Sequence, residues 1–106
     1  DVYKRQAIEP AESPVMSGGE PGLHGIQGIG DGSKFLVDLD FVDEVHTIKT
    51  STSESASKHL AKKYGLFVGV SAGANLYSSF DCLRKNNCKN AITIICDRGE
   101  RYFSCL

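Results

Sequence analysis

After residue 40 the sequence alternates between strand-like and helix-like patterns, an order that few folds satisfy. The strand-like runs are short and rich in apolar, β-branched or aromatic residues, and the helix-like segments repeat apolar residues every three or four positions. Strands connected through helices form parallel sheets with right-handed crossovers. The sequence therefore predicts an α/β fold, a parallel sheet with flanking helices. The expected order is strand 41–49, a helix from Ser51, strand 66–70, helix 72–85 and strand 91–96.

The first of these helices has sequence signals at both ends. Ser51 and Glu54 have the S-x-x-E spacing of a capping box, in which the two side chains bond to free backbone N–H groups. Gly65 follows the last apolar repeat, where a glycine commonly ends a helix. These signals predict a helix of about 13 residues. Asn86 and Asn87 provide a similar stop for the second helix.

A long loop precedes this region. Seven of the 11 glycines lie between Gly18 and Gly32, and all three prolines lie in or just before that stretch. We therefore expect residues 10–33 to form one loop after a short strand at residues 7–9. A loop of this length inside a compact domain is uncommon unless it binds something.

Parallel α/β sheets bind ligands at the carboxyl ends of their strands, where loops and helix N-termini gather. Three features of this chain follow predicted strands. The glycine-rich loop follows strand 7–9, Ser71 follows strand 66–70, and Asp97 follows strand 91–96. We expect the binding site at this edge. For Cys96 and Asp97 the alternative is a core thiol and a polar cap at a strand end.

Residues 69–73 match G-x-S-x-G, which in hydrolases places a nucleophilic serine between a strand and a helix. The triad on that fold has its histidine after the serine, whereas His24, His46 and His59 all precede Ser71. An esterase is therefore disfavoured. Two interpretations remain: the glycines only permit close packing while Ser71 caps the helix, or Ser71 hydrogen-bonds a ligand.

The segment GIGDG at residues 28–32 has the spacing G-x-G-x-G, follows no strand and opens no clear helix. A dinucleotide site needs G-x-G-x-x-G between a strand and a helix, so a Rossmann cofactor is disfavoured. Glycines at this spacing still let backbone groups approach a small anionic ligand closely, because no Cβ intervenes.

The composition excludes several classes of partner. The 106 residues include 12 Lys and Arg against 13 Asp and Glu, without the basic excess that phosphate-backbone binding requires. No apolar run approaches the ~20 residues of a membrane span, and the four cysteines form no C-x-x-C pair. We therefore expect no nucleic-acid or membrane partner, no metal site, and a cytoplasmic protein with reduced thiols.

Three segments together resemble the C-terminal third of cysteine synthase (O-acetylserine sulfhydrylase), a fold-type II enzyme dependent on pyridoxal 5'-phosphate (PLP) and similar in fold to tryptophan synthase β. The resemblance covers residues 7–104, and these motifs in this order are hard to obtain by chance. The wider family includes cystathionine β-synthase and other β-replacement enzymes. The segments are IEPAESPVMSGGEPGLHGIQGIGDG, GLFVGVSAGA and ITIICDRGERYFS.

The resemblance implies roles for particular residues. It places Ser71 at the serine that hydrogen-bonds the pyridine nitrogen of PLP, and Asp97 on the strand-end segment near the pyridine ring. It also implies a loop that lines the substrate side of the pocket, formed by Gln27, Gly28, Ile29 and Gly30.

The resemblance also implies that part of the enzyme is absent from these residues. In the family, the Schiff-base lysine and the GTGGT phosphate loop precede this third, and no motif here matches either of them. We therefore expect residues 7–106 to be the C-terminal part of an incomplete PLP-binding catalytic domain that is inactive alone. Residues 1–6, DVYKRQ, resemble the translation of a sequencing-library adapter, and we expect them to be non-native. They are therefore left out of the fold prediction.

The function implied for the complete enzyme is β-replacement of O-acetylserine by sulfide, which gives L-cysteine and acetate. The implied partners are these small-molecule substrates, a second copy in a homodimer, and serine acetyltransferase, which some members of the family bind. The alternatives are a cystathionine β-synthase or an O-phosphoserine sulfhydrylase. An alternative of another class is a non-catalytic binding module.

Overall fold

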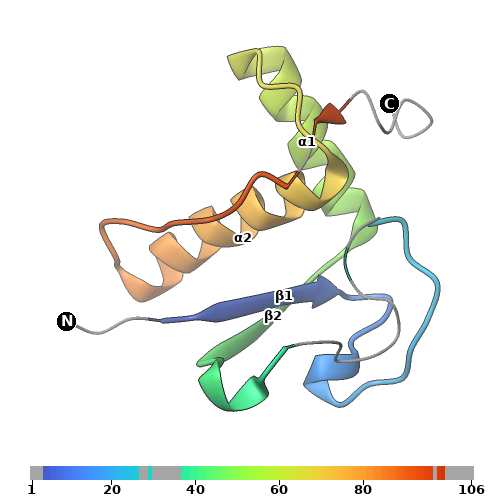
Figure 1. The fold of residues 1–106 in the computed structure, drawn as a ribbon. Coiled ribbons are helices and arrows are strands. Elements are labelled where there is room, and N and C mark those ends of the chain that lie inside the picture. The colour runs from blue at the N-terminus through green and yellow to red at the C-terminus, as the bar shows by residue number, and fades with distance from the viewer. Residues whose placement is uncertain (1–3, 27–28, 30–36, 97, 100–106) are drawn as a thin grey trace. The chain divides into compact units, whose positions relative to one another are not determined.

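The computed structural model describes residues 4–26, 29, 37–96 and 98–99. The chain divides into two compact units, Asp1–Thr50 and Ser51–Leu106. Strands lie in the first unit and most of the helical residues in the second (Figure 1). The elements are β1 (Gln6–Pro10), β2 (Glu44–Ile48), α1 (Thr50–Tyr64) and α2 (Val70–Asn86), with short 3₁₀ turns η1 (Val15–Ser17) and η2 (Leu39–Phe41).

The first unit is built on a parallel pair of strands. β1 pairs with β2 in the register that places Gln6 opposite Glu44 and Pro10 opposite Ile48. The parallel pairing and the strand at residues 7–9 confirm the sequence prediction. The strand predicted at 41–49 is shorter than expected, because η2 occupies its start and the Asp38 side chain accepts the Asp40 N–H.

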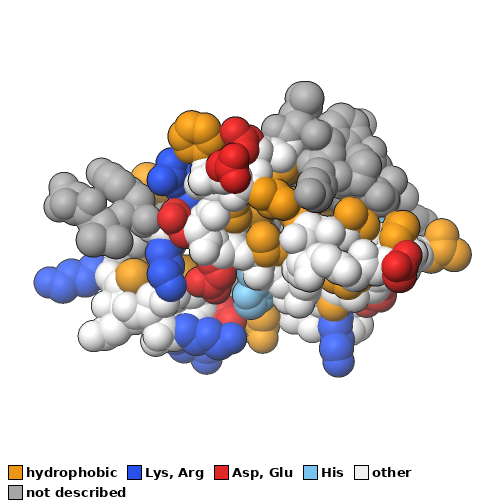
Figure 2. Space-filling model, turned by 90° about the horizontal axis from the view of Figure 1, so that it is seen from below, with side chains coloured by type: hydrophobic (Ala, Val, Ile, Leu, Met, Phe, Trp, Pro, Cys, Tyr) orange, Lys and Arg blue, Asp and Glu red, His pale blue; other side chains and the backbone are white. Residues whose placement is uncertain are grey.

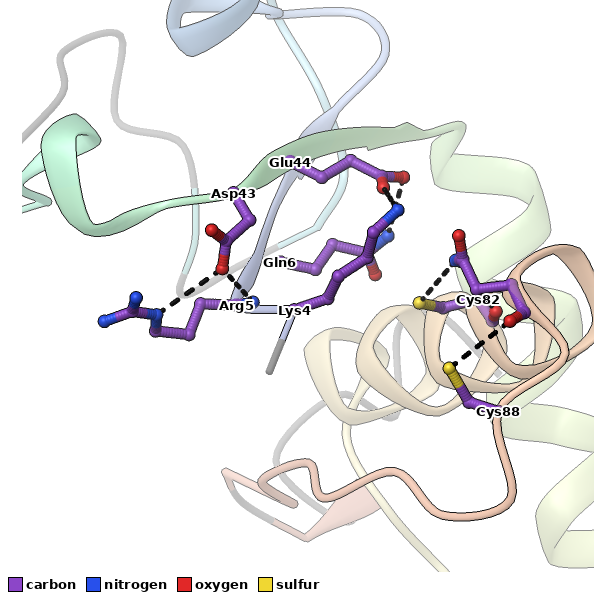
Figure 3. Close-up of polar contacts among 8 residues, drawn as sticks. Lys4, Arg5, Gln6, Asp43, Glu44, Cys82 and Cys88 are labelled. Carbon is purple, nitrogen blue, oxygen red and sulfur yellow. Dashed lines mark hydrogen bonds and ion pairs between the residues drawn. The ribbon is translucent and has the colours of Figure 1, made fainter. Parts of the chain in front are cut away.

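Residues 4–6 belong to this unit. The Lys4 ammonium lies 3.2 Å from a Glu44 carboxylate oxygen, and the Arg5 backbone N–H donates to Asp43 at 2.7 Å (Figure 3). The bond from the Arg5 N–H holds the pKa of Asp43 below its ordinary value. Residues 4–6 therefore extend the contact between β1 and β2. Their origin stays a prediction.

Helix α1 ends as the sequence predicts but begins differently. Gly65 has φ +67° and its N–H donates to the Ala61 carbonyl, so it is the left-handed residue that ends the helix. At the other end, the Thr50 N–H donates to the Glu12 carboxylate. The predicted capping box is therefore wrong, because a side chain 38 residues earlier caps the helix in place of Ser51.

Helix α2 packs closely on α1 in the second unit. A Cβ on Gly73 would lie 2.5 Å from the Ser53 carbonyl oxygen and 2.9 Å from the Ser57 nitrogen, so only glycine permits this approach. Leu60, Val68 and Ala72 form the buried apolar cluster beside this contact, with Leu76 packed against them. Asn87, with φ 51°, ends α2, as the sequence predicts.

Two predicted buried strands do not form. Val68 makes only an isolated antiparallel bridge with Arg98, and Val70 already belongs to α2. Residues 91–96 are not a strand in the described part of the chain, and Ile92 is 98% exposed. A buried parallel strand needs neighbours on both edges and cover on both faces. Val68 and Val70 are buried but pair with no parallel strand in the described part of the chain, and residues 91–96 lack the cover. The space-filling view accordingly shows apolar side chains at the surface (Figure 2).

Candidate functional site

Ser71 lies in the first turn of α2. Gly69 precedes this helix as its N-cap, and the residues from Val70 to Ala74 are all buried. Ser71 itself is 2% exposed. The first turn contains no acidic residue, so its free N–H groups and the positive end of the helix dipole are not neutralised by a carboxylate there. This position favours an electron-rich ligand atom.

The packing interpretation of G-x-S-x-G has two parts, close packing at the glycines and a helix cap from Ser71. The N-cap residue of α2 is Gly69 and no side chain makes a cap hydrogen bond, so Ser71 does not cap the helix. Gly73 does serve packing, but against α1 in place of the expected strand. A glycine of the motif therefore permits close packing, but of helix on helix. The predicted capping role of Ser71 is wrong.

In the first unit, Glu9 organises the start of the glycine-rich loop. This residue stands near the end of β1 and is 2% exposed. Its carboxylate accepts the Met16 backbone N–H at 2.7 Å and the Ser17 hydroxyl at 2.5 Å. Both bonds go to η1, so the carboxylate folds the loop back onto the end of β1.

Glu12 and Thr50 hold a later part of the same loop. The Glu12 carboxylate accepts the Thr50 N–H at 3.0 Å and the Thr50 hydroxyl at 3.0 Å. The same hydroxyl oxygen accepts the Gly25 N–H at 3.0 Å. Desolvation acts to raise the pKa of Glu12, but the bonds from Thr50, the bond from the Glu12 N–H and the nearby His24 together keep that pKa below its ordinary value. Glu12 is therefore ionised at neutral pH.

The predicted site residues are only partly described. Ser71 is buried in the second unit and Ile29 is half-buried in the first. Gln27, Gly28, Gly30 and Asp97 lie outside the described residues. Their roles stay predictions. Sequence reasoning missed Glu9, Glu12 and Thr50. The first two could have been noticed as carboxylates at the end of a predicted strand, in the segment EPAES.

The described residues hold neither a metal-binding cluster nor a membrane-spanning helix. They contain no group of three or more His, Cys, Asp or Glu that could hold a metal ion. Neither helix in that part of the chain has the length and apolar character to cross a membrane. Cys82, Cys88 and Cys96 are free thiols, and Asn86 contacts both Cys82 and Cys88 (Figure 3).

Comparison with known proteins identifies the relatives of the chain. No family model matches it. It is 36% identical over 102 residues to cysteine synthase of Staphylococcus aureus and 39% identical over 100 residues to cysteine synthase B of Campylobacter jejuni. The chain is homologous to cysteine synthases. Each alignment covers 92% of this chain and 32% of the relative, so the chain spans about one third of the cysteine synthases that it matches.

Solved structures agree with this relationship. Cysteine synthase of Entamoeba histolytica superposes with a TM-score of 0.90 at 36% identity, over 95% of this chain and 31% of that enzyme. The O-acetylserine-dependent cystathionine β-synthase of Helicobacter pylori superposes with a TM-score of 0.78 at 31% identity, over 96% of this chain and 34% of that enzyme. The fold is therefore that of part of a fold-type II PLP enzyme, as expected.

Proposed function

We propose that this chain is the C-terminal part of a PLP-dependent cysteine synthase, which replaces the acetate of O-acetylserine with sulfide to give L-cysteine. The observation that carries the proposal is the similarity to cysteine synthases over 92% of the chain. In this reaction the Cα proton is removed and acetate leaves with the electron pair of its Cβ–O bond. Sulfide then forms the new Cβ–S bond, and a proton returns to Cα.

The residues present fit the cofactor. PLP, when bound, supplies an electron sink that stabilises negative charge at the substrate Cα. Ser71 offers a buried neutral hydroxyl in the first turn of α2, and that hydroxyl is not used to cap the helix. A neutral partner leaves the pyridine nitrogen without a full positive charge, which suits β-replacement. We assign Ser71 and Asp97 to cofactor binding.

The substrate side of the pocket is assigned to Gln27, Gly28, Ile29 and Gly30. Glycines at positions 28 and 30 let backbone groups approach the amino-acid substrate, since they carry no Cβ. Support comes from the loop itself, which the buried Glu9 carboxylate anchors beside the end of β1. The rest of the proposal follows the sequence resemblance: a cytoplasmic enzyme that forms a homodimer and is a candidate partner of serine acetyltransferase.

The Ser71→Ala variant of the complete protein, with the missing upstream sequence restored, tests this proposal. A lost cofactor hydrogen bond should weaken PLP affinity or turnover roughly 5- to 150-fold while the protein stays folded and coloured. Ser79→Ala, on the same helix, is the matched control and should leave both unchanged. Ser71→Asp should alter the visible absorption, because it places a carboxylate beside the nitrogen. Unaltered affinity, spectrum and rate in Ser71→Ala would refute the assignment.

The similarity to the Helicobacter pylori enzyme supports a second candidate, a cystathionine β-synthase activity. The two candidates share the amino-acid substrate and differ in the sulfur nucleophile. Turnover of O-acetylserine with sulfide alone would favour the first, whereas a strong preference for a thiol-bearing amino acid would favour the second.

A further inference from the structure

One threonine hydroxyl joins two distant positions of the glycine-rich loop. The Thr50 hydroxyl donates its only proton to Glu12, and its oxygen accepts the Gly25 N–H. The Glu12 carboxylate also accepts the Thr50 backbone N–H, so the threonine is held at two points. A hydrogen bond to an ionised carboxylate is roughly twice as strong as one between neutral groups. The acceptor that Gly25 uses is therefore fixed in place and in orientation.

The residue after Gly25 is also fixed. Ile26 is fully buried, and its N–H donates to His24 Nδ1 at 3.1 Å. The backbone at Gly25 and Ile26 thus has one bond to Thr50, one local bond and a buried side chain. Gln27, the first of the residues assigned to the substrate side, follows Ile26 in the sequence.

We propose that Glu12 and Thr50 are positioning residues, which hold the Gly25–Ile26 backbone and so determine where the substrate-binding residues begin. They act through the loop and do not touch the substrate. The inference rests on the proposed function, since it assigns the purpose of the network to amino-acid binding. It goes beyond the roles assigned to Ser71 and the glycines, because neither Glu12 nor Thr50 is one of those residues.

The sharpest test is Thr50→Val in the complete holoenzyme. Valine keeps the shape of threonine and the N–H that Glu12 accepts, but removes the hydroxyl that Gly25 requires. We expect hydrogen exchange at the Gly25 and Ile26 amides to become about tenfold faster. We expect KM for O-acetylserine to rise roughly 3- to 10-fold, with a smaller change in kcat and an unchanged cofactor absorption spectrum.

Two variants accompany this measurement. Thr50→Ser restores a hydroxyl and should return exchange and KM close to their original values. Thr47→Val makes the same chemical change at an exposed position of β2 and should move neither. Should Thr50→Val fail to fold, Glu12→Gln serves instead, because it keeps an acceptor for the Thr50 N–H while removing the charge. It should then give faster exchange and a raised KM.

The outcomes separate the two proposals. Faster exchange with a raised KM, both reversed in Thr50→Ser, supports the positioning role. Faster exchange with unchanged KM means that the network only stabilises the loop, and overturns it. Unchanged exchange in an active enzyme also overturns it and leaves the proposed function intact. An unsubstituted protein without β-replacement activity overturns the proposed function itself.

Discussion

The Glu12 carboxylate should make the stability of the protein depend on acidity. Its pKa in the folded state lies below the ordinary value of 4.5, since the bonds from Thr50, the bond from its own N–H and the nearby His24 together outweigh desolvation. A lowered folded-state pKa means that the stabilisation is complete above that ordinary value and is lost as the pH falls through the lower one. We expect Glu12→Gln to lower the free energy of unfolding at pH 7. Between pH 7 and pH 3, this free energy should fall less in the variant than in the unsubstituted protein.

Urea unfolding at the two pH values would measure this difference. Glu20→Gln removes an exposed carboxylate of the same loop and provides the control, which should follow the unsubstituted protein. An equal loss of stability on acidification in Glu12→Gln and the unsubstituted protein would show that another group is responsible.

The roles of individual residues could be predicted from the sequence only where the signal lies within a few neighbouring residues. Ser71 could be placed at a helix start from the segment GVSAG, because glycine, serine and the following apolar residues lie together. The cap of α1 could not, since its acceptor Glu12 is 38 residues before Thr50. The local S-x-x-E spacing at Ser51 predicted a different cap, which is wrong. Glu9 was missed for the same reason: its burial depends on how the loop folds back.

Between elements, the crossing of α1 and α2 depends on Gly73. Alanine normally favours a helix over glycine by about 1 kcal/mol, so Gly73→Ala would stabilise α2 if space allowed. Its Cβ would instead lie 2.5 Å from the Ser53 carbonyl oxygen, a backbone atom that cannot rotate away. We expect a net destabilisation of roughly 1–3 kcal/mol, which is typical of overpacking, measured by thermal or urea unfolding of the complete protein.

Gly65→Ala is the comparison for this variant. Nothing lies within 4 Å of a Cβ at Gly65, and only its φ of +67° disfavours alanine, so a loss of about 1 kcal/mol is expected there. A stabilised Gly73→Ala variant would show that the helices can separate without cost.

The helices were easier to predict than the strands. The extent of α2 follows from its own periodicity and from Asn87, so the sequence contains what is needed. The apolar runs 66–70 and 91–96 indicate burial, but the structure buries them only in part. Val68 and Val70 are buried, whereas Leu66 is 47% exposed and Ile94 69% exposed. Only β1 and β2 pair as a sheet in the described part of the chain, because each finds its partner within the first unit.

For the molecule as a whole, the apolar side chains that stay exposed predict how the isolated chain behaves. The relatives are about three times as long, and an apolar groove lined by residues of α1 and α2, among them Leu60, Leu76 and Phe80, is open in the second unit. Phe80 is 61% exposed. Exposed apolar surface of this kind marks an interface or an aggregation liability. We expect the isolated chain to bind an apolar fluorescent dye strongly and to be poorly soluble.

The isolated chain should also lack activity, because the family's Schiff-base lysine and phosphate loop have no counterpart among its motifs. Incubation with PLP followed by borohydride reduction should label no single lysine, and O-acetylserine with sulfide should give no cysteine above the uncatalysed rate. Addition of the separately expressed upstream part should lower dye binding, since the apolar surface becomes covered, and should restore turnover if the two parts assemble. Specific labelling of one lysine in the chain alone would contradict the assignment of this chain as the C-terminal part of the enzyme.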